Sequence, residues 1–111
     1  MKKTLMIDLD GVLNTYQGDY KENKISPVRE GAKEFLEELS KDFIIEIFTV
    51  RDRKLTISWL EENNLIEYIK EVTNVKKSHA FAFIDDRAIC FEGEFKTILS
   101  KLKTFKPFWQ K

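Results

Sequence analysis

The sequence predicts an α/β fold of three layers: a parallel sheet with helices on both faces. Short apolar runs that resemble strands alternate along the chain with longer segments of helical periodicity, which is the pattern of a parallel sheet. The chain has 111 residues, the size of one domain, so we expect a single domain over residues 1–111. Hydrophobic residues make up 42% of the chain and charged residues 34%, as in folded soluble domains rather than disordered segments.

The first half of the chain predicts two strands and one helix. Residues 4–9 are apolar and end among acidic residues, so we expect a strand there, followed by a polar loop over 14–25. Ser26 and Pro27 suit the N-cap and the first position of a helix. Apolar residues follow at helical spacing on one expected face: Val28, Ala32, Phe35, Leu36 and Leu39. The run FIIEIFT, residues 43–49, is rich in β-branched and aromatic side chains and predicts the second strand.

The second half of the chain predicts two more helices and further strands. Residues 53–63 predict a helix, and a short extended piece is expected at 71–73. The run AFAFI, residues 80–84, is apolar on both faces, as a buried parallel strand would be. We expect another short strand at 88–91 and a last helix over 94–103. The residues expected to face inward on the two helices are Leu55, Trp59 and Leu60, then Phe95, Ile98, Leu99 and Leu102.

Charge and composition give no general reason to expect several classes of partner, although a local basic patch stays possible. Nineteen basic residues balance nineteen acidic ones, which gives no general reason to expect nucleic acid or an anionic membrane. The apolar stretch 5–7 is too short for a signal peptide, and no apolar run is long enough to cross a bilayer. Cys90 is the only cysteine, so no intramolecular disulfide can form, and we expect it to be a small buried hydrophobe. These features fit a cytoplasmic protein with no membrane partner.

The predicted strands end in residues that suit phosphate chemistry. In parallel α/β folds, ligands bind beyond the carboxyl ends of the strands. Three predicted strands lead to acids or a hydroxyl there: Asp8 with Asp10, Thr49, and Asp85 with Asp86. An acidic cluster repels itself unless a cation sits in it, and Mg²⁺ prefers a few carboxylates together with phosphate oxygens. A carboxylate can attack phosphorus directly, and a second acid two residues on could protonate the leaving oxygen.

Four motifs resemble those of the haloacid dehalogenase (HAD) superfamily. The run IDLDGVLN, residues 7–14, resembles the first motif, an acid pair spaced DxDG after an apolar strand. The run FTVR, residues 48–51, resembles the second motif, and KSHAFAFIDDRA, residues 77–88, resembles the third and fourth. The four occur in the family's order across nearly the whole chain. The resemblance implies a Rossmann-like core and a magnesium-dependent phosphate monoester hydrolase that forms an aspartyl phosphate.

The resemblance also assigns roles to the four acids. Asp8 becomes the nucleophile and a metal ligand. Asp10 becomes the general acid/base, and its backbone carbonyl also binds the metal. Asp85 becomes a metal ligand, and Asp86 a partner of the metal from further out or through water. The implied substrate is a small phosphorylated molecule, with a sugar phosphate or a nucleotide as the expected class.

Phosphate and substrate contacts are carried over in the same way. Thr49 and Lys77 would bind the phosphoryl group. Lys76 is the rival for Lys77, which is preferred for its spacing to the acid pair that follows it. Arg51, Lys76 and Gly11 are the candidates for substrate contact.

One feature of many HAD enzymes has no counterpart in this sequence, namely a cap domain. The gap over residues 15–25 holds only a flap-sized loop, and the gap over 51–76 holds one helix and a short extended segment. The sequence therefore resembles a capless form, in which the flap, a partner subunit or a large substrate must exclude water. The aromatic tail at 105–109 either folds back over the core or forms a homo-oligomer contact.

Simpler interpretations of these residues stay open. Asp-Gly pairs often only cap turns, and the acid pair near residue 85 could be an exposed turn. Tyr16 and Tyr20 either contact substrate or anchor the flap, while Arg87 either contacts substrate or pairs with a neighbouring acid. Two other functions use the same residues: phosphoryl transfer to an acceptor other than water, and a non-catalytic module that binds magnesium and phosphate.

Overall fold

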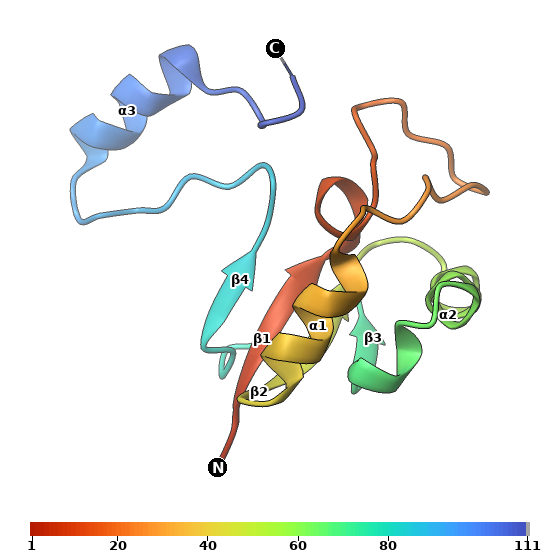
Figure 1. Cartoon of the computed structure of the whole chain (residues 1–111). Helices are drawn as coiled ribbons and strands as arrows, with labels where there is room; N and C mark the ends of the chain where they lie inside the picture. The colour runs from red at the N-terminus through yellow and green to blue at the C-terminus, as the bar shows by residue number, and fades with distance from the viewer. Residues whose placement is uncertain (111) are drawn as a thin grey trace.

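A computed structural model describes residues 1–110 and contains a four-stranded sheet in the order β3-β2-β1-β4 (Figure 1). The strands are β1 (Lys3–Asp8), β2 (Phe43–Phe48), β3 (Glu71–Thr73) and β4 (Ala82–Ile84). Every pair of neighbouring strands is parallel. The prediction of an α/β fold with a parallel sheet is therefore confirmed.

The strand order makes β1 the strand at which the chain changes direction across the sheet. From β1 the chain moves outward to β2 and then β3, and it returns past both to place β4 on the other side of β1. The carboxyl ends of β1 and β4 therefore flank the topological switch point of the sheet. Open α/β sheets bind their ligands at that point.

The hydrophobic core lies between one face of the sheet and two helices, α1 (Ala32–Ser40) and α2 (Arg53–Glu62). Side chains alternate between the two faces along a strand, so every second residue of β1 and β2 points to this core. The buried residues that the face and the helices share include Leu5, Ile7, Ile45, Ile47, Leu36 and Leu60. Among residues 1–110 the longest helices have ten residues, and none combines the length and the apolar character that crossing a bilayer requires.

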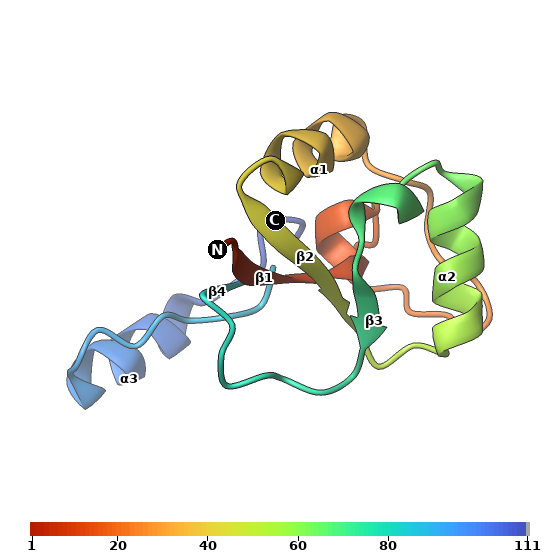
Figure 2. The same cartoon turned by 90° about the horizontal axis from the view of Figure 1, so that it is seen from below.

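No helix packs on the opposite face of the sheet within residues 1–110. The crossing from β3 to β4 lies over that face, where the Lys77 backbone N–H donates to Met6 Sδ at 3.4 Å. Helix α3 (Phe95–Thr104) buries none of its side chains and stands apart from the sheet (Figures 1 and 2). The expected third layer is therefore not confirmed.

The expected start of the first helix is wrong by several residues. Ser26 and Pro27 do not open it, because the backbone there is extended against the first loop. The Thr15 N–H donates to the Pro27 carbonyl at 2.9 Å, and the Arg29 N–H donates to the Leu13 carbonyl at 2.8 Å. Helix α1 begins only after Gly31, whose φ of 88° marks the change of direction. Phe35 is 41% exposed rather than buried, because the core contacts of α1 are made by Ala32, Leu36 and Leu39.

Four predictions for the second half of the chain are also wrong. Residues 88–91 form no strand, and Cys90 is exposed. Strand β4 is an edge strand with one uncovered face, so Phe81 and Phe83 are 56% and 42% exposed instead of buried. The expected inward residues of α3 are open to solvent for the same reason, since no surface of the sheet receives them: Phe95, Leu99 and Leu102 are exposed and Ile98 is only partly covered.

Candidate metal centre and active site

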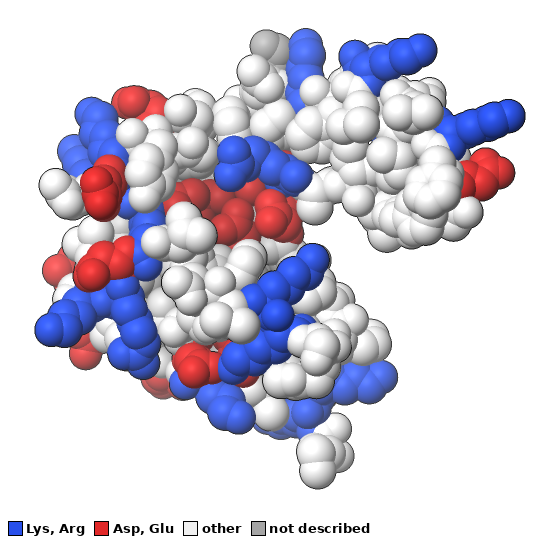
Figure 3. All heavy atoms as spheres, turned by 180° about the vertical axis from the view of Figure 1, so that it is seen from behind, with Lys and Arg blue, Asp and Glu red and all other residues white. Residues whose placement is uncertain are grey.

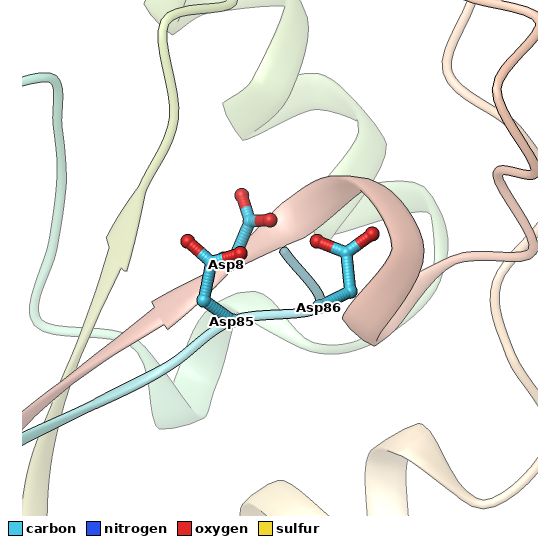
Figure 4. A group of neighbouring side chains, drawn as sticks. All are labelled: Asp8, Asp85 and Asp86. Carbon is cyan, nitrogen blue, oxygen red and sulfur yellow. The ribbon is translucent and has the colours of Figure 1, made fainter. Parts of the chain in front are cut away.

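Three carboxylates converge at the switch point of the sheet (Figure 4). Asp8 is the last residue of β1, while Asp85 and Asp86 follow β4 directly. The parallel register pairs Ile7 with Ile84, so the next residue of each strand reaches the same edge. One oxygen from each of the three acids lies within 4.8 Å of the others. The structure thus brings together the acids of the first and last predicted motifs.

Backbone hydrogen bonds hold two of these carboxylates in place. Asp8 Oδ1 accepts a hydrogen bond from the Leu9 N–H at 2.9 Å, at the start of the irregular helical turn η1 (Leu9–Leu13). Asp85 Oδ1 accepts a hydrogen bond from the Arg87 N–H at 2.8 Å. Each carboxylate therefore has one oxygen fixed by the turn that follows its strand.

The electrostatics of the cluster favour a bound cation. Burial raises the pKa of Asp8 from 3.8 to about 8, and the neighbouring carboxylates of Asp86 and Asp85 add to the rise. Asp86 Oδ1 is buried, and no group among residues 1–110 hydrogen-bonds to it. A buried carboxylate oxygen without a partner is costly, and a hard divalent cation would satisfy it and offset the repulsion. The three acids therefore fit Mg²⁺ by the chemistry of their donor atoms.

Gly11 and Trp109 enclose the other side of Asp86. The Trp109 indole N–H donates to Asp86 Oδ2. Gly11 has a φ of 85°, and a Cβ there would overlap the Asp86 carboxylate and lie 3.0 Å from Trp109 Nε1. Gly11 is buried behind these two side chains and packs against them, and its expected contact with substrate stays a prediction.

Asp10 is not one of the three clustered carboxylates, and two side chains hold it. Arg51 donates from Nε to Asp10 Oδ2 at 2.7 Å and from Nη2 to Oδ1 at 3.1 Å. The Asn14 amide also donates to Oδ1 at 3.1 Å, while its own oxygen accepts from the backbone N–H groups of Gly11 and Tyr16. Sequence reasoning missed Asn14, although its place directly after Val12 and Leu13, at the end of IDLDGVLN, was a signal for a buried polar contact.

Arg51 anchors the flap instead of facing open solvent. It is only 5% exposed, and its Nη1 donates to the Lys21 carbonyl at 2.8 Å. Its guanidinium also lies 4.4 Å from the centre of the Tyr20 ring. Arg51 also lines the cavity that it shares with Thr49, so its expected role in substrate binding stays a prediction.

An open cavity of about 190 Å³ lies beside the three carboxylates. Its lining residues are Asp8, Asp10, Tyr16, Tyr20, Phe48, Thr49, Val50, Asp85 and Arg87. Figure 3 shows acidic side chains gathered in a hollow between the sheet and the projecting α3, with basic side chains next to them. A neighbouring cavity of about 250 Å³ shares Thr49 but is lined by no carboxylate, so the chemistry belongs to the smaller one. Thr49 is buried, and its Oγ1 accepts from the Arg51 N–H at 3.2 Å.

The two lysines have different neighbours. The Lys77 ammonium lies 2.8 Å from Glu46 Oε1 and also binds Glu71, and hydrogen bonds to these acids raise the pKa of Lys77. Lys76 lines a cavity of about 100 Å³ together with Asp8. Its ammonium lies over the Phe83 ring, 4.5 Å from the ring centre. The structure therefore places Lys76, and not the preferred Lys77, beside the expected nucleophile.

Fold and site together define an α/β protein with a carboxylate cluster at the switch point of a parallel sheet. No family model matches the sequence, and no curated protein matches it. A solved structure of a conserved protein from Bacteroides thetaiotaomicron is similar, with a TM-score of 0.61 and 19% sequence identity. The match covers 93% of this chain and 91% of that chain. At that identity the likeness supports the fold alone.

Proposed function

We propose that this chain is a magnesium-dependent phosphate monoester hydrolase of the HAD type that forms an aspartyl phosphate on Asp8. The observation that carries the proposal is the convergence of Asp8, Asp85 and Asp86 beside an open cavity at the switch point. A Rossmann-like core is part of the same proposal. The substrate is a small phosphorylated molecule such as a sugar phosphate or a nucleotide.

Asp8, Asp85 and Asp86 are the residues that would hold the metal. When bound, Mg²⁺ supplies positive charge that offsets the three carboxylates and the phosphate oxygens. The unpartnered Asp86 Oδ1 and the burial-raised pKa of Asp8 both support this assignment, because a bound cation would supply the partner that Oδ1 lacks and the counter-charge that ionised Asp8 needs. Thr49, Arg87 and Lys76 line the cavities next to Asp8 and are the candidates for contact with phosphate oxygens.

The proposed reaction has two steps. In the first, an Asp8 oxygen forms a bond to phosphorus, the bond from phosphorus to the leaving oxygen breaks, and Asp10 gives that oxygen a proton. In the second, a water oxygen attacks the phosphorus of the aspartyl phosphate and passes a proton to Asp10. The bond between Asp8 and phosphorus then breaks, which releases inorganic phosphate and restores the Asp8 carboxylate.

A second candidate function is a module that binds magnesium and phosphate without turnover. The observation in its favour is the position of Asp10, whose oxygens accept hydrogen bonds from Arg51 and Asn14. Proton transfer would require Asp10 to exchange at least one of these bonds for the substrate. Catalytic hydrogen bonds often form only with substrate bound, so the hydrolase stays the leading proposal.

Hydrolysis of an aryl phosphate, with and without Mg²⁺, tests the proposal. Wild type should show Mg²⁺-dependent turnover, and Asp8→Asn should abolish it because an amide cannot act as the nucleophile. Asp10→Asn should lower kcat by roughly 10²–10⁴-fold, as expected for loss of a general acid/base. Asp42→Asn, an exposed acid outside the cavity linings described above, is the matched control and should keep the wild-type rate. Near-normal turnover by Asp8→Asn would overturn the mechanism, whereas Mg²⁺ binding without any turnover would favour the binding module.

A further inference from the structure

We propose that Trp109, from the C-terminal tail, is a positioning residue for the metal centre. The inference rests on the proposed metal site and adds to it a residue outside the four motifs. The indole N–H of Trp109 fixes the orientation of Asp86 and leaves the second oxygen of this carboxylate available to a cation.

The hydrogen bonds of Asp86 show how the positioning works. Asp86 Oδ2 accepts from the Trp109 indole N–H, whereas Oδ1 is buried and has no hydrogen-bond donor among residues 1–110. A carboxylate with neither oxygen held could rotate about its side-chain torsion. With Oδ2 held by a donor-only group, the remaining oxygen is left for a metal, which is the arrangement that outer partners impose on metal ligands.

The Trp109 ring packs closely against the loop after β1. A Cβ on Gly18 would lie 3.1 Å from the ring, and a Cβ on Gly11 would lie 3.0 Å from the indole nitrogen. Both glycines have positive φ, 98° and 85°. The Tyr16 ring meets the indole edge-to-face at 5.6 Å between ring centres. These contacts place Trp109 against Asp86 and the flap at the same time.

The residues before Trp109 bring the tail back from α3. Pro107 is buried, and the Phe108 ring lies 5.0 Å from the Arg29 guanidinium. The tail thus returns from the projecting helix to the site and covers one side of Asp86. This tail gives the proposed metal centre a wall that the four motifs alone do not supply.

Calorimetric titration of the full chain with Mg²⁺ tests the inference without requiring turnover. Trp109→Phe keeps an aromatic ring but loses the N–H, and we expect its Kd for Mg²⁺ to rise about 10-fold to 100-fold, as for loss of other outer partners of metal ligands. At saturating Mg²⁺ its kcat should stay near wild type. Phe108→Leu alters the same tail without touching Asp86 and should leave the Kd unchanged. Should Trp109→Phe fail to fold, Trp109→His, whose ring can still donate, replaces it and should bind Mg²⁺ within a few-fold of wild type.

The outcomes separate this inference from the proposed function. An unchanged Kd in Trp109→Phe, with or without a lower Tm, would mean that Trp109 only packs the tail, and would overturn the inference alone. A weakened Kd in a protein without phosphatase activity would overturn the hydrolase and support the inference. If wild type binds no Mg²⁺, both are overturned.

Discussion

Arg51 clamps the carboxylate of Asp10 through two hydrogen bonds, from Nε at 2.7 Å and from Nη2 at 3.1 Å. The two residues come from the ends of neighbouring strands, 41 positions apart in the sequence. The same guanidinium holds the backbone carbonyls of Lys21 and Glu22 in the flap. One buried side chain therefore ties together the first motif, the second motif and the loop that borders the cavity.

Removal of this clamp should destabilise the whole domain. Arg51→Met leaves Asp10, whose side chain is only 16% exposed, without its ionic partner, and frees the flap carbonyls. Loss of one partner of a buried ion pair costs about 3 kcal/mol or more, and we expect a loss near the lower end in urea unfolding. Arg53→Met, two residues on and exposed, is the control and should change stability by less than about 0.5 kcal/mol. Equal effects of the two substitutions would show that the clamp contributes no stability.

The stability of the metal-free protein should fall as the pH rises. Folding raises the pKa of Asp8 from 3.8 to about 8, so the folded state binds the proton more tightly than the unfolded state does. The corresponding stability is fully present below pH 3.8 and is lost progressively up to about pH 8. Thermal unfolding in a chelating buffer across this range measures the slope.

Two further measurements test whether Asp8 causes this pH dependence of stability. Asp8→Asn cannot ionise, so its pH dependence should be flatter than that of wild type. Mg²⁺ should raise the Tm of wild type more at high pH than at low pH, because the metal and the proton compete for the same carboxylates. A slope that persists unchanged in Asp8→Asn would assign it to other groups.

Gly11 and Gly31 offer a matched pair of substitutions. Both have positive φ, 85° and 88°, so alanine at either position pays a backbone cost of about 1–2 kcal/mol. A Cβ on Gly31 meets open space, whereas a Cβ on Gly11 collides with the Asp86 carboxylate. We expect Gly11→Ala to lose more stability than Gly31→Ala and, unlike it, to weaken Mg²⁺ binding. Equal losses with unchanged Mg²⁺ affinity would contradict the packing described for Asp86.

Substitution of Lys76 should weaken substrate binding, whereas substitution of Lys77 should lower stability. Lys77→Ala leaves the buried Glu46 without its cation and should lower the urea midpoint. Lys76→Ala removes a cation that lines a cavity with Asp8 and should raise the KM for a phosphate ester with little change in stability. Steady-state kinetics and urea unfolding of both variants decide the matter; a KM effect confined to Lys77→Ala would restore the original preference.

The carboxyl edge of the sheet was the most predictable part of the chain. Residues 4–9 and 43–49 carry a strong local strand pattern, and parallel pairing brings the ends of such strands to one edge regardless of the rest of the fold. Asp8, Asp85 and Asp86 follow from that rule alone. The choice between the lysines did not, since both lie in a loop, yet Glu46 within FIIEIFT was a signal that a buried acid needed a nearby cation.

The parts that sequence reasoning missed depend on contacts between distant segments. The apolar periodicity of α3 describes a helix that can be buried, but it does not identify a surface that receives it. Ser26 and Pro27 are good helix-start residues, but pairing of the neighbouring backbone with the loop after β1 outweighs that local preference. The Trp109 contact joins positions 23 residues apart and has no local pattern at all.

The projecting helix also bears on how the chain can change in length. The hydrogen bond between Trp109 and Asp86 closes a loop of the chain. Helix α3 is part of this loop and buries none of its side chains. The entropic cost of closing a flexible loop grows only with the logarithm of its length, so doubling the length of the loop costs about 0.6 kcal/mol. The segment between the two anchors can therefore be lengthened, shortened or exchanged at little thermodynamic cost, provided that a tryptophan still returns to the carboxylate.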